Sequence, residues 1–259
     1  MKYRFFLLSI ILLFNSCRKK NVFLHSEIYG HAGMGLNITS SIYAPNTLQS
    51  VRMACQFEKV TGVELDVRMS KDGVLWCYHD DYLEKATNGT GCIENLFSDN
   101  IEGIKYNSLH SETLFKLDAS LLDQSKQYLL DLKIYNACEE ETIDLVMLDS
   151  LLSQLAQTLQ FDLILSNSAG LNFFSDRYPC YFSTTIDNIT DAELQNNNIK
   201  GFVLRNKEVD RDKVLTLQGY GKKVILFDIR SNAGNRKALE KGPNAILSDD
   251  IRTALGYVP

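Results

Sequence analysis

The sequence predicts a single (β/α)8 TIM barrel of the α/β class. Short apolar strand-like runs alternate with helix-like runs along most of the 259 residues, which is typical of parallel βαβ units. Eight strand-like runs in one chain, at a length close to the roughly 250 residues of such folds, indicate a closed barrel. An open doubly wound sheet is the alternative, but no glycine-rich phosphate loop follows the first strand.

The expected elements follow one another in a regular order. A strand at 26–30 precedes a helix at 46–59. The turn Lys71-Asp72-Gly73 joins strand 62–69 to strand 74–78, which indicates a β-hairpin extension after the second barrel strand. The remaining strands are expected at 127–134, 161–165, 180–186, 201–204, 223–227 and 245–247, and the remaining helices at 139–160, 169–177, 190–197, 210–219 and 234–241.

The first residues have the features of an export signal. Lys2 and Arg4 precede an apolar run over 5–14, which is too short to span a bilayer as a helix. A basic start, a short apolar run and a small residue after it are typical of a secretory signal. Cys17 follows Ser16 directly, and this pair resembles the lipobox of bacterial lipoproteins.

These features predict the boundaries of the segments and the cellular location of the protein. The expected segments are a lipoprotein-type signal peptide over 1–16, a tether over 17–25 and one barrel domain over 26–259. An acyl chain on Cys17 would hold the protein at a membrane surface without a span. We therefore expect an exported bacterial lipoprotein on the periplasmic or outer-membrane face. An uncleaved signal anchor is the alternative.

Composition and cysteine spacing argue against a nucleic-acid-binding protein and against a zinc site. The net charge of −5 gives no basic footprint, so no nucleic-acid partner is expected. The six cysteines contain no Cys-x-x-Cys pair, so no zinc site is expected. Export would permit disulfides, but the wide spacing fits buried small residues as well, and no particular bridge is predicted. Nothing in the sequence indicates the oligomeric state.

Two carboxylates share one face of the second expected strand. Glu64 and Asp66 are two residues apart, so their side chains point the same way. Adjacent carboxylates inside a barrel are costly without a counter-charge, and a bound cation would remove that cost. Ligands that are all oxygen favour Ca²⁺ or Mg²⁺. The alternative is the exposed face of an edge strand.

Asp131 and Lys133 repeat this spacing on the third expected strand. They too share one face of their strand. Asp131 is therefore a candidate third metal ligand. Lys133 is a candidate for binding a phosphate oxygen of the substrate, because its ammonium group is a compact point charge. A purely structural acid–base pair is the alternative.

Two of the four histidines stand where strands are expected to end. His31 ends the first strand, and His79 ends the hairpin. Barrel enzymes carry their catalytic residues at the C-terminal ends of strands, and two imidazoles beside a phosphorus atom could act as general acid and base. His25 lies in the tether and His110 in a polar loop, and both are expected to be solvated.

The chain resembles the glycerophosphodiester phosphodiesterase family over nearly all of its exported part. The motifs that carry the resemblance occur in the order seen in that family, and the set between 62 and 91 is specific. These motifs are His31-Ala-Gly, Pro45-Asn-Thr47, Glu64-Leu-Asp66-Val, Ser70-Lys-Asp-Gly73, His79-Asp80, Thr87-Asn-Gly-Thr-Gly91, Leu130-Asp-Leu-Lys133 and Ala245-Ile-Leu-Ser-Asp249.

This resemblance implies a fold, a reaction and a cofactor. The family is a (β/α)8 barrel with one divalent metal ion, usually Ca²⁺ or Mg²⁺, and it hydrolyses glycerophosphodiesters to sn-glycerol 3-phosphate and an alcohol. In that family the glycerol hydroxyl of the substrate attacks phosphorus, and water then opens the cyclic product. By resemblance, His31 and His79 are the acid–base pair and Lys133 binds the small-molecule substrate. The metal ligands implied in the same way are Glu64, Asp66 and Asp131.

Three positions depart from the family pattern. Ala32 stands where the family has an arginine that helps to hold phosphate. The glutamate expected before Asn46 is missing, and Asp131 replaces a longer glutamate. Arg68 or Lys71 could supply a substitute positive charge for the missing arginine.

Two further functions remain open beside glycerophosphodiester hydrolysis. The expected membrane anchor makes a lyase or phospholipase acting on intact lipids possible. The alanine in place of the phosphate-binding arginine favours a barrel that binds a phosphorylated ligand without turnover, whereas the retained histidines and carboxylates speak against it. A fold alone does not decide between these functions, because function depends on the site.

Overall fold

A computed structural model describes residues 26–36 and 42–259 of the chain. The predicted signal peptide over 1–16, the tether over 17–25 and the anchor at Cys17 lie outside these residues. Within the described part, none of the helices has the length and apolar character needed to cross a membrane.

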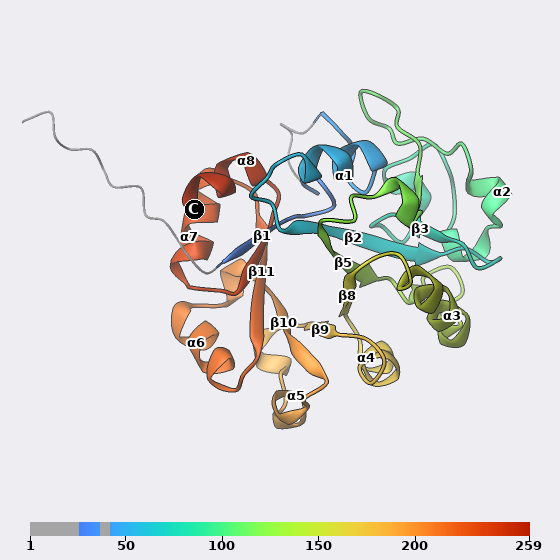
Figure 1. The fold of residues 1–259 in the computed structure, drawn as a ribbon. Helices are drawn as coiled ribbons and strands as arrows, with labels where there is room; N and C mark the ends of the chain where they lie inside the picture. Colours follow the sequence, from blue (N-terminus) through green and yellow to red (C-terminus); the bar gives the residue numbers. More distant parts are fainter. Residues whose placement is uncertain (1–25, 37–41) are drawn as a thin grey trace, which may run out of the picture.

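The described residues form the predicted closed barrel (Figure 1). Ten strands make one sheet, of which β3 and β4 pair antiparallel, so eight parallel strands remain for the barrel. The sheet closes on itself because β1 pairs with both β2 and β12. The barrel strands are β1 (Glu27–Gly30), β2 (Gly62–Met69), β5 (Gln127–Leu132), β8 (Phe161–Leu165), β9 (Cys180–Ser183), β10 (Ile199–Arg205), β11 (Lys223–Ile229) and β12 (Ala245–Ser248).

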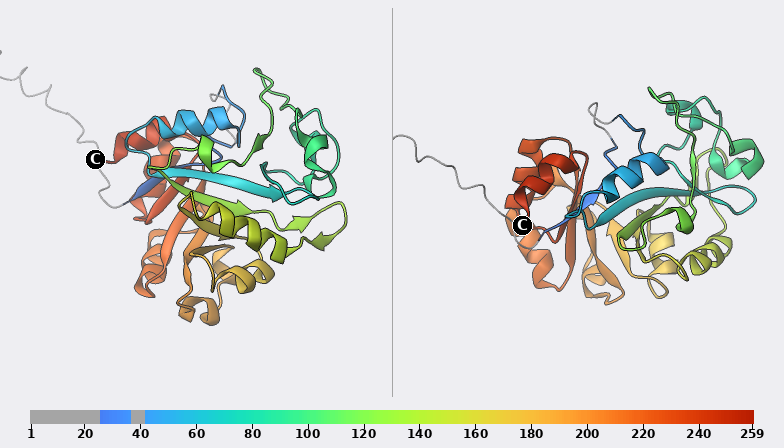
Figure 2. Two further views of the ribbon diagram at one scale, coloured as in Figure 1. Left: turned by 45° about the vertical axis from the view of Figure 1, so that its right-hand side comes forward. Right: turned by 45° about the horizontal axis from the view of Figure 1, so that its top comes forward.

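The barrel strands are hydrophobic because apolar side chains cover both faces of the sheet. Parallel strands in such folds are buried on both faces. The outward side chains pack in a large core against the helices, which surround the barrel (Figure 2). The inward side chains fill the barrel with a smaller core. This inner core comprises Tyr29, Leu129, Ile164, Tyr181, Val203, Ile225, Ala245 and Leu247.

The helices begin where short polar side chains cap them. An N-cap oxygen accepts a backbone N–H that has no partner in the first helical turn. The helices with such a cap are α1 (Leu48–Cys55), α3 (Leu145–Leu155), α4 (Ser168–Phe174), α5 (Asp191–Gln195), α6 (Arg211–Gly219), α7 (Asn232–Glu240) and α8 (Ile251–Ala254).

The helix expected over 139–160 is shorter than predicted. It begins only after Asp144, whose side chain accepts from two backbone N–H groups of the first turn. The segment before it forms a small antiparallel pair, β6 (Tyr135–Asn136) with β7 (Glu141–Thr142). The sequence pattern was misleading here because acidic residues are equally typical of a first helical turn.

The extension after the second barrel strand is larger than a hairpin. β2 continues into β3 (Leu75–Cys77), as predicted. β3 then pairs with β4 (Phe115–Lys116), and the chain between them forms short turns and the single-turn helix α2 (Ser98–Ile101). This segment has a hydrophobic core of its own. Figure 1 shows it beyond the far end of β2, beside the barrel.

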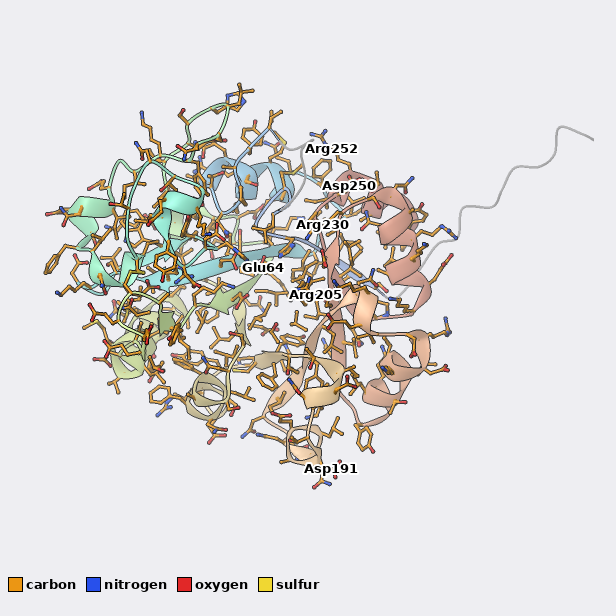
Figure 3. All side chains as sticks on the ribbon, turned by 180° about the vertical axis from the view of Figure 1, so that it is seen from behind. Glu64, Asp191, Arg205, Arg230, Asp250 and Arg252 are labelled. Carbon is orange, nitrogen blue, oxygen red and sulfur yellow. A yellow bond between two sulfur atoms is a disulfide. The ribbon has the colours of Figure 1, made fainter. Side chains whose placement is uncertain are left out.

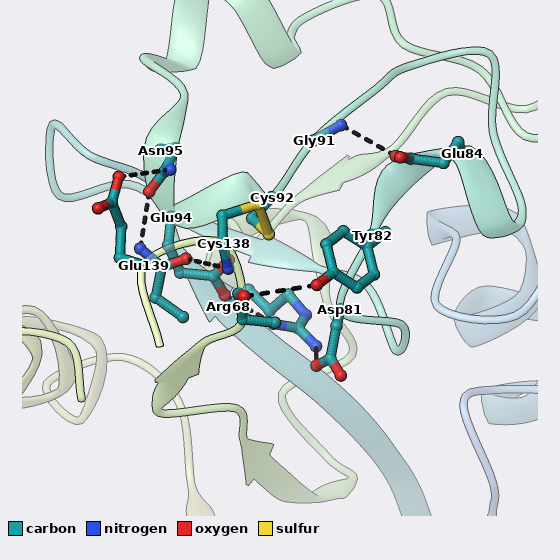
Figure 4. Close-up of a disulfide and its surroundings, with 12 residues drawn as sticks. Arg68, Asp81, Tyr82, Glu84, Gly91, Cys92, Glu94, Asn95, Cys138 and Glu139 are labelled. Carbon is teal, nitrogen blue, oxygen red and sulfur yellow. Dashed lines mark hydrogen bonds and ion pairs between the residues drawn. A yellow bond between two sulfur atoms is a disulfide. The ribbon is translucent and has the colours of Figure 1, made fainter. Parts of the chain in front are cut away.

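A disulfide between Cys92 and Cys138 ties this extension to the loop after β5 (Figure 4). The two cysteines are 46 residues apart, and closing a loop of that length in the unfolded chain corresponds to about 4 kcal/mol in the chain-entropy estimate. The other described cysteines, Cys55, Cys77 and Cys180, are free and buried. The spacing alone could not have shown which two would pair.

Candidate functional site

A cavity of about 330 Å³ opens at the C-terminal ends of the barrel strands. Its lining includes the six described side chains to which the sequence analysis gave a catalytic, metal-binding or substrate-binding role. These are His31, Glu64, Asp66, His79, Asp131 and Lys133. They come from three neighbouring strands of the barrel and from the loop after β3. The cavity therefore lies at the end where barrel enzymes carry their active sites.

The register of two strands brings the three acidic side chains together. Asp66 of β2 lies directly beside Asp131 of β5, and Glu64 is two residues before Asp66 on the same face. Ligand oxygens of the three carboxylates lie within 4.8 Å of one another. Glu64 and Asp66 are almost completely buried, so the alternative of an exposed edge strand does not hold.

The acidic group has the donor set of a hard divalent cation. All its ligand atoms are carboxylate oxygens, which Ca²⁺ and Mg²⁺ prefer. Oδ1 of Asp131 is buried and has no hydrogen-bond partner among the described residues, which is costly for a polar atom unless a ligand satisfies it. The carboxylates therefore fit a metal ion, and Glu64, Asp66 and Asp131 are the residues that would hold it.

Lys133 neutralises part of this acidic group. Its Nζ lies 2.8 Å from Oδ1 of Asp66 and 2.7 Å from Oδ2 of Asp131. Burial alone would raise the pKa of Asp66, but the charges of Lys133 and His79 and the hydrogen bonds from Lys133 and Asn46 together lower it. Burial and the neighbouring Asp66 raise the pKa of Glu64. A bound cation would favour the ionised carboxylate of Glu64 and so oppose this rise.

Asn46 and Ala32 fix the positions of the two β2 carboxylates. Asn46 donates from Nδ2 to Oδ2 of Asp66 at 2.7 Å and accepts from the Asp66 backbone N–H at 3.0 Å. The Ala32 backbone N–H donates to Oε2 of Glu64 at 2.9 Å. Both residues have positive φ angles, 59° and 51°, which are costly for non-glycine residues and often occur at functional sites.

His31 is held by a carboxylate from the last barrel strand. Its Nδ1 lies 2.8 Å from Oδ1 of Asp249, which is completely buried, and its Nε2 lies 3.9 Å from Oε2 of Glu64. Burial alone would lower the pKa of His31, but the hydrogen bond with Asp249 and the charge of Glu64 raise it to about 9. The Asp249 contact fixes the ring and leaves Nε2 toward the cavity.

Asp249 is a site residue that sequence reasoning missed. Although a Ser-Asp pair before a helix is typical of a cap, the N-cap of α8 is Asp250 and not Asp249. Asp249 instead accepts from the Leu36 backbone N–H at 2.8 Å and pairs with His31. Its place directly after an apolar strand was the available signal, since barrel sites are built there.

His79 is the more exposed of the two histidines, with 43% of its side chain accessible. Its Nδ1 lies 3.1 Å from Oδ1 of the neighbouring Asp80. Below it, Arg68 is buried and donates to the His79 carbonyl oxygen at 3.1 Å and to Oδ1 of Asp81 at 2.7 Å. Arg68 also donates to Oε1 of Glu94 at 2.7 Å. This network supports the turn that carries His79, and Figure 4 shows Arg68 with its partners Asp81 and Glu94.

Neither residue expected to replace the missing positive charge at position 32 lines the cavity. Arg68 is engaged in the network described above, and Lys71 lines a different hollow beside α3. Two other arginines do line the cavity, Arg205 at the end of β10 and Arg230 after β11. Figure 3 shows both beside Glu64 near the centre of the molecule. No recognisable motif surrounds either arginine in the sequence, so neither was predicted.

Fold and site together define the class of protein. It is a (β/α)8-barrel protein whose cavity joins an acidic metal-type site to a carboxylate-held histidine at the catalytic end of the barrel. The profile of the Glycerophosphoryl diester phosphodiesterase family matches residues 31–253. The chain belongs to this family, as its motifs indicated.

Individual relatives are distant in sequence. A Bacillus subtilis protein that bears the name glycerophosphodiester phosphodiesterase is 22% identical over 229 residues, which cover 81% of this chain and 91% of the relative. A Mycobacterium tuberculosis protein of the same name is 29% identical over 86 residues, and this match covers 33% of the chain and 29% of the relative.

Solved structures share the barrel. A glycerophosphoryl diester phosphodiesterase structure from Agrobacterium tumefaciens superposes with a TM-score of 0.75 at 14% identity, covering 89% of this chain and 96% of the other. A phosphodiesterase from Oleispira antarctica, solved with the product sn-glycerol-3-phosphate, gives a TM-score of 0.74 at 23% identity with the same coverage. At these identities the likeness establishes the fold.

Proposed function

We propose that the protein hydrolyses glycerophosphodiesters to sn-glycerol 3-phosphate and an alcohol, with one divalent metal ion, Ca²⁺ or Mg²⁺. The observation that carries this proposal is that the three carboxylates, Lys133 and both histidines line the same cavity. The family and the sn-glycerol-3-phosphate bound to the Oleispira relative support the substrate class.

The acidic residues and the histidines would have separate roles in the reaction. A metal ion on Glu64, Asp66 and Asp131 would stabilise negative charge on the phosphate and on the reacting oxygens. The two imidazoles would move protons, one from the attacking hydroxyl and one to the departing alcohol oxygen. His31 suits this work because Asp249 holds its Nδ1 and Nε2 remains for the substrate.

The test is release of sn-glycerol 3-phosphate by the purified full-length protein in detergent. Glycerophosphocholine and glycerophosphoethanolamine would be assayed with Ca²⁺, Mg²⁺ or a chelator. We expect turnover only with metal, and losses of about 10²- to 10⁴-fold in kcat/KM for His31→Ala and for His79→Ala. His110→Ala, a loop histidine at a separate surface hollow, is the matched control and should retain activity.

Other outcomes of this assay would replace the proposal. Cleavage of the phosphodiester of intact phosphatidylcholine, but not of its deacylated form, would identify a phospholipase or lyase-type phosphodiesterase. Binding of sn-glycerol 3-phosphate by a folded protein that turns over neither substrate class would identify a binding protein.

We also propose that the protein is an exported lipoprotein, anchored through Cys17 after removal of residues 1–16. The sequence of the first 17 residues carries this proposal. The Cys92–Cys138 disulfide supports it independently, because stable disulfides are typical of oxidising compartments and rare in the cytosol.

Replacing the anchor cysteine tests this location. In a bacterial host we expect the unaltered protein in the membrane fraction with a covalently attached acyl chain, detected by mass spectrometry of the N-terminal peptide. Cys17→Ser should lose the acyl chain and move to a soluble fraction, whereas Cys55→Ser, at a free buried cysteine, should remain lipidated. An acyl-free N-terminus on the unaltered protein would contradict the anchor.

A further inference from the structure

The cavity holds a second charged cluster across from the acidic residues. Arg205, Asp228 and Arg230 line it from β10 and from the end of β11. Nη1 of Arg205 donates to Oδ2 of Asp228 at 2.8 Å, and Nη2 of Arg230 lies 2.9 Å from Oδ1 of the same carboxylate. One aspartate thus holds two guanidinium groups, and the cluster keeps a net positive charge.

The backbone of β11 is shaped so that Arg230 reaches the cavity. The register between β11 and β12 shifts between Leu226 and Ile229, and Asp228 has a φ of 63°. These two features describe a bulge, which inserts a residue and reverses the alternation of side chains. Ile229 consequently packs in the outer core, while Asp228 and Arg230 both line the cavity.

A left-handed aspartate in a strand has an energetic cost. Non-glycine residues seldom adopt this region, because Cβ then lies too close to the following carbonyl oxygen. Such outliers cluster at ligand sites, where the surrounding structure maintains them. Here the outlier is the residue that aims and holds Arg230.

Arg230 is the cation of the cavity with the most capacity to bind a ligand. Lys133 is already paired with two carboxylates, and Arg205 is shared between Asp228 and Glu208. Arg230 contacts Asp228 through Nη2, its Nε stays 4.0 Å from Oδ2 of Asp249, and 54% of its side chain is accessible. A guanidinium group has five N–H donors in a fork that matches phosphate oxygens.

Its position also favours phosphate over other anions. Arg230 lies in the loop after the seventh barrel strand, and Asp249, which holds His31, follows the eighth. TIM barrels frequently bind phosphate with the loops after these two strands. A phosphate there would contact Arg230 on one side and the His31 ring on the other.

We propose that Arg230, positioned by Asp228, binds the phosphate group of the phosphodiester. This inference rests on the proposed function for the identity of the substrate. It assigns to the loop after β11 the positive charge that Ala32 does not supply. Arg230 contacts substrate, whereas Asp228 acts through Arg230 as a positioning residue.

Substitutions at the two residues test this assignment. For Arg230→Ala we expect KM to rise about 10- to 100-fold for every glycerophosphodiester, because one charge-assisted, forked contact is lost. Arg230→Lys should recover only part of this loss, since a point charge cannot form the fork. Asp228→Asn should also raise KM, but by a smaller factor. Asparagine tolerates the left-handed backbone at this position.

Arg236→Ala is the matched control, because Arg236 is exposed on α7 and pairs with Glu240. It should leave KM unchanged, and all variants should keep the circular dichroism spectrum of the unaltered protein. An unchanged KM in Arg230→Ala would overturn the proposal. So would a loss confined to substrates with an anionic headgroup, because Arg230 would then recognise the headgroup instead of the phosphate.

Calorimetric binding of sn-glycerol 3-phosphate in the presence of Mg²⁺ separates this inference from the proposed hydrolysis. If the unaltered protein turns over no substrate but binds this probe, and Arg230→Ala weakens binding about 10-fold or more, the phosphate site stands and the hydrolytic proposal fails. If the unaltered protein does not bind the probe, or if Arg230→Ala binds it equally well, the phosphate site is overturned.

Discussion

Replacing Asp249 by asparagine should reduce kcat/KM by about 10²- to 10⁴-fold, by analogy with the carboxylate that orients a catalytic histidine in serine proteases. The substitution keeps the size of the side chain but removes the charge that holds Nδ1 of His31 at 2.8 Å. An amide can present an N–H to the ring and stabilise the wrong tautomer. Because the change is nearly isosteric, the barrel should still close.

The pKa of His31 in the metal-free protein gives a second readout of the same variant. In the unaltered protein this pKa is raised from 6.5 to about 9, against the effect of burial. The stability that His31 contributes is therefore fully present below about pH 6.5 and is lost as the pH rises through about 9. In Asp249→Asn the pKa, followed by NMR titration, should fall and this loss of stability should shrink.

Asp250→Asn is the matched control for this prediction. Asp250 is the adjacent N-cap of α8, and asparagine is an equally good cap, so activity and the His31 pKa should stay near those of the unaltered protein. Full activity in Asp249→Asn together with an unchanged His31 pKa would contradict the role given to Asp249.

Removing the buried Arg68 should lower the free energy of unfolding by about 3 to 5 kcal/mol. Arg68→Met keeps the length of the side chain but leaves the buried carboxylate of Glu94 without its 2.7 Å partner. It also removes the donor to the His79 carbonyl oxygen, so activity should fall at temperatures where the variant is still folded. Urea unfolding under oxidising conditions would measure the loss of stability.

The double variant Arg68→Met with Glu94→Leu shows whether Arg68→Met loses stability through lost packing or through the unpaired charge of Glu94. It should regain much of the stability, because buried ion pairs can often be replaced by apolar side chains once both partners are removed. Arg52→Met on the exposed face of α1 is the control and should change stability by less than about 0.5 kcal/mol. A loss below about 1 kcal/mol in Arg68→Met would show that the pair is weaker than its burial suggests.

The barrel and the acidic site could be predicted because local patterns encode them. Strands buried on both faces appear as apolar runs, and the two-residue repeat of a strand puts Glu64 with Asp66, and Asp131 with Lys133, on one face each. The order of the runs then indicates which strands are neighbours, since consecutive parallel strands with helical crossovers usually lie side by side.

The missed residues depend on features that no local pattern encodes. Asp249 lies 218 positions from its partner His31, and a serine–aspartate pair before a helix is equally typical of a cap. Arg230 enters the cavity only because Asp228 adopts a left-handed backbone. The Cys92–Cys138 pairing depends on how the extension folds back toward the loop after β5. Each case is decided by tertiary structure.

The contact between the first and the last barrel strands also has a consequence for folding during synthesis of the protein. β1 finds its second neighbour only when β12 arrives, and bringing together segments some 218 residues apart costs about 5 kcal/mol of chain entropy. Contacts at such separations form late in folding. A growing polypeptide therefore carries His31 without Asp249 until residue 249 has been translated, so any phosphodiester chemistry that requires the pair cannot occur before that point.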